Sequence, residues 1–265
     1  MVNYRNDLET EAFLHKCFKI KGADQAQFAI ANNSAQSRED LGFSGLSSNS
    51  VCVVNFPDNP GYFPAAQKVW EQFKTREFKY VILSNTDLEI LNSDFYDLLL
   101  NHSTEENVGV IAPSIKSELT RRECNPLYRV RPTKQKIKFL KFIYSRFTFA
   151  WIYHVLSFIK ARSTPESSLP DHSYVYAPNG SFLILTKNYF ESGGDFSHGV
   201  RMYGEEIVLA EKLRELDLKV KLSLKLRIFH REKGSEANFW QRMGLSKRTF
   251  EFKKEAAELL ALKFD

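Results

Sequence analysis

The 265-residue chain has no run of about eighteen apolar residues, the length that a helix needs to cross a membrane, so we expect no transmembrane helix. Its three cysteines, Cys17, Cys52 and Cys124, are odd in number and widely spaced. This spacing argues against a disulfide framework and a zinc site, and it favours a reducing cytosol. Residues 1–9 are too polar for a secretory signal, and no internal repeat is present. These absences indicate a cytoplasmic globular protein.

The composition is that of an ordinary globular chain, with 43% hydrophobic and 26% charged residues. The net charge of +5 is distributed unevenly. Residues 134–162 contain no acidic side chain but carry several cations: Lys134, Lys136, Lys138, Lys141, Arg146, Lys160 and Arg162. Such a zone suits an anionic surface or an anionic ligand.

Strand-like and helix-like patterns alternate along the first 90 residues. Short apolar runs at residues 28–31, 51–54 and 80–83 alternate with helical spacing at residues 8–19 and 65–73. This order predicts an α/β fold with a mostly parallel sheet and helices on its faces. Each predicted strand ends in Asn, Asp, Ser or Gly, so the strand ends form a polar rim where ligands bind in such sheets.

The polar cluster after the strand at residues 80–83 is the first candidate site. Asp87, with Asn85 two residues before it, offers oxygen ligands for a hard cation. The alternative is a polar turn after a core strand, and these residues alone do not distinguish the two.

Two adjacent carboxylates, Glu205 and Glu206, open a predicted helix at residues 206–216. Acidic residues at a helix N-terminus stabilise the helix dipole, so simple capping is one explanation. A carboxylate that reaches an acceptor proton would instead act as a general base.

His230 ends the predicted strand at residues 219–229, and a cationic Gly-Ser loop follows it. A lone histidine is usually structural, whereas in this setting it also suits a metal or a phosphate. Residues 55–61 form a similar strand-end loop, which is either a turn or a nucleotide contact.

Residues 137–159 are basic, aromatic and amphipathic. Such a helical stretch can lie in a membrane interface with its cations towards anionic head groups. The alternatives are a helical subdomain or an oligomer interface. Nucleic-acid binding is disfavoured, because the aromatic residues follow an apolar helical face and not a stacking platform.

In their order, these motifs resemble the family 2 glycosyltransferases of the GT-A fold, in particular bacterial rhamnosyl- and galactofuranosyltransferases of polysaccharide biosynthesis. Residues 83–87 look like the Leu-Asn-Pro-Asp form of the Asp-x-Asp metal motif. Residues 193–196 followed by 203–206 resemble Gly-Gly-Phe-Asp followed by Tyr-x-Glu-Asp, which holds the catalytic base. His230 with residues 234–235 resembles the terminal His-x-x-Gly-Ser.

Other segments add to the resemblance, which extends over residues 2–235. Residues 2–6, 59–66 and 179–182 are similar to the first strand end, an Asn-x-Gly stretch and the acceptor-side strand. Three positions depart from the pattern. Asn32 replaces the acid that contacts the nucleotide, Glu206 stands where Asp is commoner, and the first strand is nearly absent before Val2.

The resemblance implies a metal-dependent inverting glycosyltransferase that moves a sugar from a nucleoside diphosphate donor to a hydroxyl of a glycan or lipid-linked acceptor in bacterial surface polysaccharide synthesis. Mn²⁺ or Mg²⁺ is expected on Asp87 and His230, with Glu206 as the base and Glu205 in support. The expected donor contacts are Tyr4, Asn32, Asn59, Gly61, Asn85 and Arg231.

The expected organisation is a GT-A domain over residues 1–235, with a helical insertion at 137–160 and a helical extension at 236–265. We expect peripheral contact with an anionic membrane, on the inner face of the cytoplasmic membrane. The alternative function is a degenerate module that binds a nucleotide sugar or a glycan at a membrane assembly without turnover.

Overall fold

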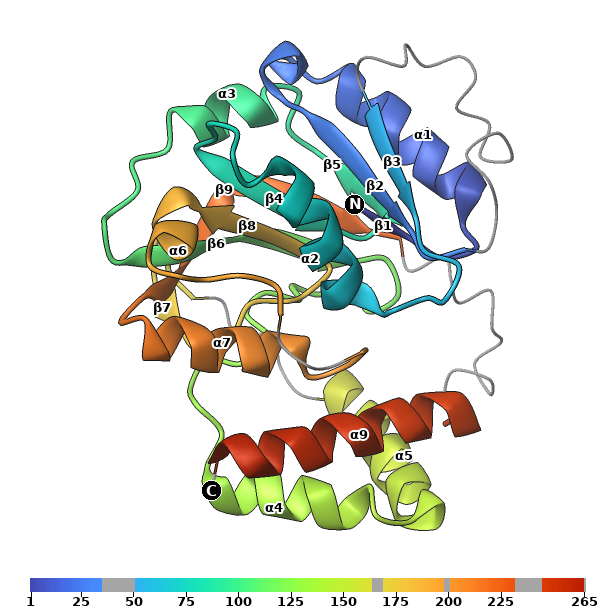
Figure 1. Ribbon diagram of the computed structural model, residues 1–265. Helices are drawn as coiled ribbons and strands as arrows, with labels where there is room; N and C mark the ends of the chain where they lie inside the picture. Colours follow the sequence, from blue (N-terminus) through green and yellow to red (C-terminus); the bar gives the residue numbers. More distant parts are fainter. Residues whose placement is uncertain (35–50, 164–168, 198–200, 232–244, 265) are drawn as a thin grey trace.

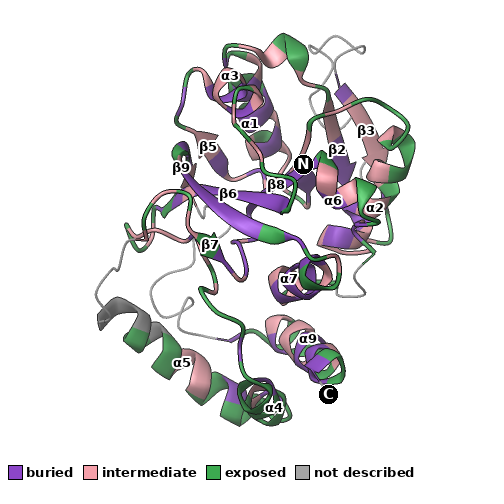
Figure 2. Ribbon diagram, turned by 90° about the vertical axis from the view of Figure 1, so that its left-hand side faces the viewer, coloured by how far each residue is buried: buried purple, intermediate pink, exposed green. Residues whose placement is uncertain are grey.

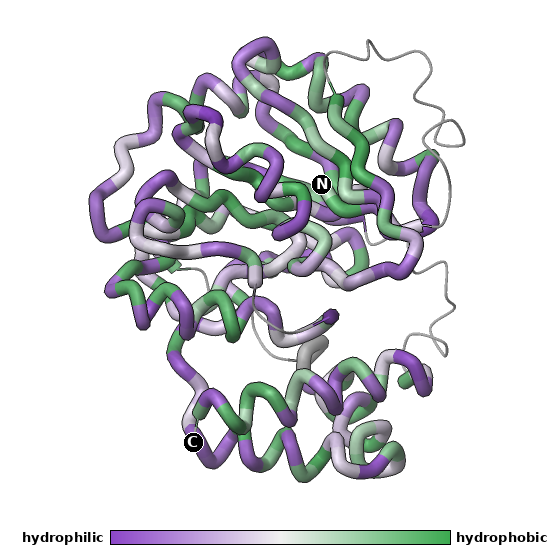
Figure 3. Tube along the Cα trace, in the orientation of Figure 1, coloured by the Kyte–Doolittle hydropathy of each residue, from purple (hydrophilic) through white to green (hydrophobic). Residues whose placement is uncertain are grey.

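The computed structural model describes residues 1–34, 51–163, 169–197, 201–231 and 245–264 (Figure 1). It has two sheets flanked by helices, and a layer of three further helices lies beneath them (Figure 1). Hydrophobic residues concentrate along the strands, whereas they alternate with hydrophilic residues along the lower helices (Figure 3). The α/β class predicted from the sequence is confirmed.

The smaller sheet is parallel and contains β1 (Val2–Asn3), β2 (Phe28–Asn32) and β3 (Val51–Asn55). Its register places Asn3, Asn32 and Asn55 side by side at the strand ends. Their side chains form a ladder, in which Asn3 Nδ2 donates to Asn32 Oδ1 over 3.0 Å and Asn32 Nδ2 donates to Asn55 Oδ1 over 2.8 Å. The ladder aligns the carboxyl ends of the three strands.

The larger sheet is mixed, which corrects the expectation of a mostly parallel sheet. Its order is β4 (Tyr80–Ser84), β8 (Phe182–Thr186), β6 (Val108–Ser117), β9 (Lys219–His230) and β5 (Leu88–Ile90), with β7 (Tyr174–Val175) on β9. The β6–β9 pair is parallel and the other pairs are antiparallel. Hydrophobic periodicity identifies buried strands but carries no information on their direction.

Strand β6 spans ten residues and contains Pro113. Its pairing with β9 shifts register between Pro113 and Ser114 and then continues to Ser117. Proline has no N–H to give to a ladder, so a proline within a strand is found at an irregularity of this kind.

Helices cover both faces of the larger sheet. One core packs α2 (Tyr62–Phe73), α6 (Lys187–Glu191) and α7 (Glu205–Glu215) against one face; the other packs α1 (Asp7–Phe18) and α3 (Phe95–Leu100) against the opposite face. A short 3-10 helix, η1 (Ala23–Gln25), follows α1. Strands β6 and β8 are buried along most of their length (Figure 2).

The predicted helical stretch at residues 137–159 is two helices, α4 (Lys134–Ile143) and α5 (Phe147–Ser163). The side chain of Thr133 caps α4, because its Oγ1 accepts the N–H of Lys136 over 3.2 Å. Both helices pack against α9 (Lys247–Phe264), and these three form the lower layer (Figure 1). Within the described residues, no helix combines the length and the apolarity that a bilayer crossing requires.

A buried ionic network joins the lower layer to the sheets. Glu211 of α7 is 6% exposed and accepts Nε of Arg131 over 2.8 Å and the hydroxyl of Tyr176 over 2.8 Å. Arg214 donates to the same carboxylate over 3.1 Å. The Arg131 guanidinium also lies 4.2 Å from the ring centroid of Phe264 in α9. The Glu211 carboxylate therefore holds side chains from three segments of the chain: the loops at Arg131 and Tyr176, and helix α7 at Arg214.

We predict that Glu211→Ala lowers the free energy of unfolding by about 1–2 kcal/mol, because it removes the buried carboxylate that accepts hydrogen bonds from Arg131, Arg214 and the Tyr176 hydroxyl. Urea unfolding followed by circular dichroism measures the change. Glu215→Ala, an exposed glutamate of the same helix, is the control and should cost less than about 0.5 kcal/mol. Equal losses in the two variants would contradict the role of Glu211.

Candidate active site

Loops from distant parts of the sequence line a cavity of about 200 Å³ at the ends of β1, β2 and β4. Five of its lining residues are site residues predicted from the sequence: Tyr4, Asn59, Gly61, Asn85 and Asp87. The polar side chains that the sequence did not predict are Asn6, Asn33, Tyr62, Thr86, Arg201 and Arg248. The parallel β1–β2 pair and the end of β4 meet at this edge, so their loops converge.

Sheet pairing brings Asp87 and His230 together from distant parts of the chain. The nearby pair Glu89 and Arg231, which is also in contact, is separated by 142 positions. The antiparallel β5–β9 pair sets Leu88 opposite His230, and Arg231 N donates to Asp87 O over 2.9 Å. The His230 Nε2 and Asp87 Oδ2 atoms are 3.3 Å apart, and both side chains are mostly buried. The two predicted metal ligands are therefore adjacent.

A carboxylate beside an imidazole is a donor set that suits Mn²⁺. In the described part of the chain, no group of three or more His, Cys, Asp or Glu side chains is placed to hold a metal. Ions such as Mg²⁺ are commonly held by one or two protein ligands together with substrate phosphates. The residues present fit a divalent ion of that kind.

The two predicted catalytic glutamates lie in the first turn of α7. Gly204 precedes the helix with φ of +79°, a conformation that favours glycine. The carboxylate of Glu206 accepts backbone N–H groups, including that of Gly180. A Cβ at Gly180 would lie 2.9 Å from Glu206 Oε1, so glycine is required for this approach.

Withdrawal of both carboxyl groups from water changes their acidity. Burial raises the pKa of Glu206. Burial, reinforced by the charge on Glu206, raises the pKa of Glu205 to about 8. The Oε2 atom of Glu205 is buried and has no hydrogen-bond partner among the described residues. A proton acceptor with a raised pKa is the type of group that general-base catalysis uses.

Tyr62 connects the cavity to the two glutamates. Its ring lines the cavity, and its hydroxyl donates to Gly180 O over 3.1 Å. Burial raises the pKa of this hydroxyl, and the charges of Glu205, Glu206 and Asp87 raise it further. Both glutamates lie outside the cavity lining, yet they and Asp87 all lie close enough to Tyr62 for their charges to act on it.

The predicted donor contacts at Tyr4, Asn59 and Gly61 lie together in the cavity wall. Arg248 Nη1 donates to the Tyr4 hydroxyl over 3.1 Å, and this bond lowers the pKa of Tyr4. Gly61 has φ of +111°, and a Cβ there would lie 2.3 Å from Arg201 O. The loop before α7 therefore packs directly on Gly61.

Two predicted donor contacts do not face the cavity. Asn32 is fully buried within the asparagine ladder, and its neighbour Asn33 lines the cavity instead. Asn33 Oδ1 is buried without a hydrogen-bond partner among the described residues. Arg231 is paired with Glu89, with 3.1 Å between Nε and Oε2. The Gly-Ser part of the His230 motif lies outside the described residues.

Two arginines of the cavity wall, Arg201 and Arg248, are not among the residues predicted from the sequence. Arg248, near the start of α9, lies 5.2 Å from the ring centroid of Tyr4 and 5.6 Å from that of Phe252. Arg201 Nη2 donates to Asn59 O over 3.4 Å. For Arg248, the sequence shows only that the last helix is basic. It does not show that this helix lies against the strand ends. The two guanidinium groups suit an anionic ligand.

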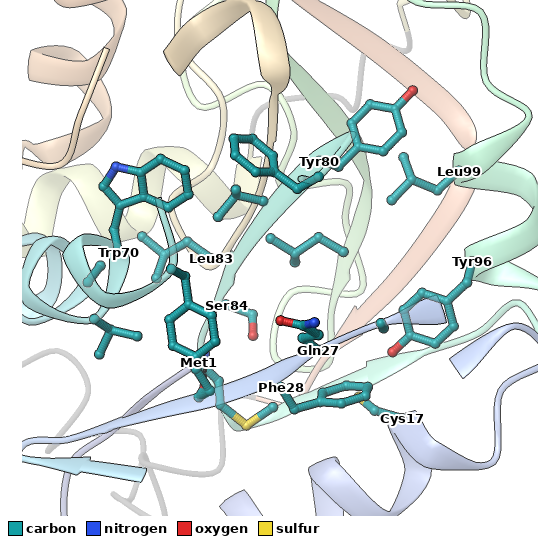
Figure 4. Close-up of a pocket in the computed structure, with 18 of the residues that line it drawn as sticks. Met1, Cys17, Gln27, Phe28, Trp70, Tyr80, Leu83, Ser84, Tyr96 and Leu99 are labelled. Carbon is teal, nitrogen blue, oxygen red and sulfur yellow. Dashed lines mark hydrogen bonds between the residues drawn. The ribbon is translucent and has the colours of Figure 1, made fainter. Parts of the chain in front are cut away.

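A second, apolar cavity of about 340 Å³ lies where β1 and β2 face the edge strand β4. Phe28, Trp70, Leu83 and Tyr96 are among its lining residues (Figure 4). None of the predicted site residues lines it, so we place the candidate site at the smaller, polar cavity.

Comparison with known proteins relates the fold to one class. No protein-family model and no curated protein matches the sequence. Among solved structures, the crystal structure of GalNAc-T7 with UDP, GalNAc and Mn²⁺ matches with a TM-score of 0.53 and 15% identity, over 84% of this chain and 41% of that chain. This chain thus spans less than half the length of that protein. The fold of this chain is the GT-A glycosyltransferase fold.

We predict that Glu205→Gln stabilises the protein at alkaline pH. The folded-state pKa of about 8 exceeds the ordinary value of 4.5, so the protonated form favours folding. That contribution is fully present below the ordinary pKa and is lost as the pH rises through the folded value. The glutamine carries no charge. We therefore expect its melting temperature to exceed that of the parent by several degrees near pH 9 and to match it at about pH 4 and below.

Thermal unfolding of both proteins across this pH range is the measurement. Glu215→Gln, at an exposed position of the same helix, controls for general charge effects. An identical melting temperature for Glu205→Gln and the parent at both pH values would refute the assigned burial of this charge.

Proposed function

We propose that the protein is a metal-dependent glycosyltransferase that moves a sugar from a nucleoside diphosphate donor to an acceptor hydroxyl with inversion at the anomeric carbon. One observation carries the proposal. In a GT-A fold, Asp87 of the Asp87–His230 pair lines the same cavity as two arginines. Tyr62 of that cavity connects it to Gly180, beside the proton-accepting Glu206.

The cavity supports a nucleoside diphosphate as the donor. Arg201 and Arg248 provide cations for the diphosphate, and the unpartnered Asn33 Oδ1 accepts a hydrogen bond from the base or the ribose. Asn59 and Asn85 supply further polar contacts. The structural neighbour GalNAc-T7 was crystallised with UDP and GalNAc, which agrees with this donor class.

Asp87 and His230 would hold Mn²⁺ or Mg²⁺. When bound, such an ion neutralises negative charge on the diphosphate leaving group as a Lewis acid. The oxygen of Asp87 and the nitrogen of His230 already lie 3.3 Å apart, so the protein side of the site needs little rearrangement. The Mn²⁺ in the GalNAc-T7 crystals is consistent with this assignment.

Glu206 takes the proton of the acceptor hydroxyl as that oxygen attacks the anomeric carbon. The N–H of Gly180 holds the carboxylate in place, and burial makes it a stronger base. Like-charge repulsion from Glu206 contributes to the raised pKa of its neighbour Glu205. Attack from the side opposite the diphosphate gives inversion.

We further propose a glycan or lipid-linked acceptor in bacterial surface polysaccharide synthesis, used at the inner face of the cytoplasmic membrane. Residues 1–235 then form the catalytic domain, with residues 137–160 as its helical insertion and residues 236–265 as an extension. The extension adds Arg248 and Phe252 to the cavity wall.

A second candidate is a binding module that holds a nucleotide sugar or a glycan without turnover. The burial of Asn32 in the asparagine ladder favours it, because no acid stands at the nucleotide position named by the resemblance. A screen of nucleotide sugars with Mn²⁺ for thermal stabilisation, followed by measurement of nucleoside diphosphate release, distinguishes the two functions. Binding without release would identify the module.

We predict that Glu206→Gln lowers kcat by roughly 10²–10⁴-fold, because the amide accepts no proton. Donor affinity, measured by thermal shift, should stay within about twofold of the parent value. In the parent protein, the rate should rise with pH as the raised pKa of Glu206 is passed. Glu215→Gln is the matched control. Full activity of Glu206→Gln would rule out its role as the base.

We predict that EDTA abolishes transfer and that Asp87→Asn removes the Mn²⁺-dependent part of the thermal shift given by a nucleoside diphosphate. Arg248→Met should weaken nucleoside diphosphate binding with or without Mn²⁺, since a guanidinium contacts phosphate directly. Asp24→Asn, an exposed residue of η1, serves as the control. Unchanged transfer in EDTA would exclude the metal site.

A further inference from the structure

The outer face of the lower layer exposes large apolar side chains. Phe142 of α4 and Leu156 of α5 are 60% and 59% exposed, and the others are Phe139, Phe149, Trp151, Ile152 and Ile159. Figure 2 shows that much of α4 and α5 is exposed. Apolar side chains gathered on one face, beyond scattered single residues, mark an interaction site.

The exposed residues form one continuous face across both helices. Phe149, Ile152, Leu156 and Ile159 recur at the three- and four-residue spacing of one α5 stripe. The rings of Phe142 and Phe149 stack with centroids 5.6 Å apart, which joins this stripe to α4. Phe139 and Tyr153 meet edge to face at 6.2 Å between centroids.

Cations border this face, and acids are absent from its helices. Lys134, Lys138, Lys141, Arg146 and Lys160 are all exposed. The sequence has no Asp or Glu between Glu123 and Glu166. An apolar stripe with Lys and Arg beside it is the composition of helices that lie in the head-group region of a bilayer.

Charge distinguishes a lipid surface from a second copy of the chain. In a two-fold dimer, each patch meets its own image, so the lysines of one copy would meet those of the other. No acidic side chain on α4 or α5 would compensate them. Anionic phospholipids supply that compensation, because their negative surface potential attracts Lys and Arg side chains near the bilayer.

The opposite side of this layer reaches the candidate active site. Helix α9 packs on α4 and α5 through Phe250, Ala257 and Leu260. The same helix carries Arg248 and Phe252 into the cavity wall. A bilayer against α4 and α5 would therefore lie one helix layer away from the cavity.

We propose that the apolar and cationic face of α4 and α5 docks the protein on an anionic phospholipid bilayer. The docking does not require the transfer reaction. It rests on the proposed function in one respect, that it sets the cavity beside a lipid-linked acceptor. A failure of docking and a failure of transfer are measured separately.

The test is co-sedimentation of the full chain with vesicles of phosphatidylcholine alone or mixed with phosphatidylglycerol. We expect binding that requires phosphatidylglycerol and weakens as salt is raised, since salt screens the lysines. Lys138→Glu with Lys141→Glu should weaken binding at least about tenfold. Phe142→Asn with Leu156→Asn should weaken it to a similar degree.

Matched controls separate this face from the rest of the surface. Lys74→Glu with Lys116→Glu makes the same charge change at exposed positions outside α4 and α5. Leu8→Asn replaces an exposed apolar residue of α1. These should bind as the parent does. Melting temperatures establish that each variant is folded.

Equal sedimentation with both vesicle types, or parent-like binding by both α4–α5 variants, would overturn the proposal. So would a parent protein that ignores vesicles but forms a dimer that Phe142→Asn with Leu156→Asn dissociates. That result would assign the face to self-association.

Discussion

The position of one carboxylate, that of Glu206, governs the candidate site. Gly180 must lack a side chain for the two residues to approach, and its N–H group meets the carboxylate directly. The Gly180 carbonyl accepts the Tyr62 hydroxyl on the cavity side. A single residue, Gly180, therefore contacts both the proposed base and the tyrosine that lines the cavity.

The segment around Gly180 is itself held by buried polar contacts. Asn125 is 5% exposed; its Nδ2 donates to Pro113 O over 2.7 Å, and its Oδ1 accepts Asn179 N over 2.7 Å. Asn179 Oδ1 in turn accepts the N–H and the hydroxyl of Ser181. Buried polar groups of this kind are costly when unpaired, so a fully paired set fixes one conformation of the loop. These hydrogen bonds hold the irregular backbone beside Glu206 in place.

The lower helical layer contacts both the sheets and the candidate site. Glu211 binds it to the sheets through Arg131, whose guanidinium covers Phe264, while Arg248 brings the start of α9 to Tyr4. The last helix is therefore part of the candidate site and not an appendage. Its opposite contacts support α4 and α5, so the cavity wall and the exposed apolar face share one structural element.

The sequence alone determined the α/β class, the helical character of residues 137–159 and of the last helix, and the polar ends of the strands. It also paired Asp87 with His230 through the resemblance, and the β5–β9 register places them in contact. The α/β class, the helices and the polar strand ends can be predicted because periodicity and composition are local properties of the chain.

Tertiary structure decided which strands run antiparallel and that Asn33, and not Asn32, lines the cavity. It also decided that the cavity cations are Arg201 and Arg248. Arg231 pairs with Glu89 instead. Each of these outcomes depends on a partner far away in the sequence. In a strand, neighbouring side chains point to opposite faces, so a change of one position moves a residue from a ladder to a cavity. No local pattern records that choice.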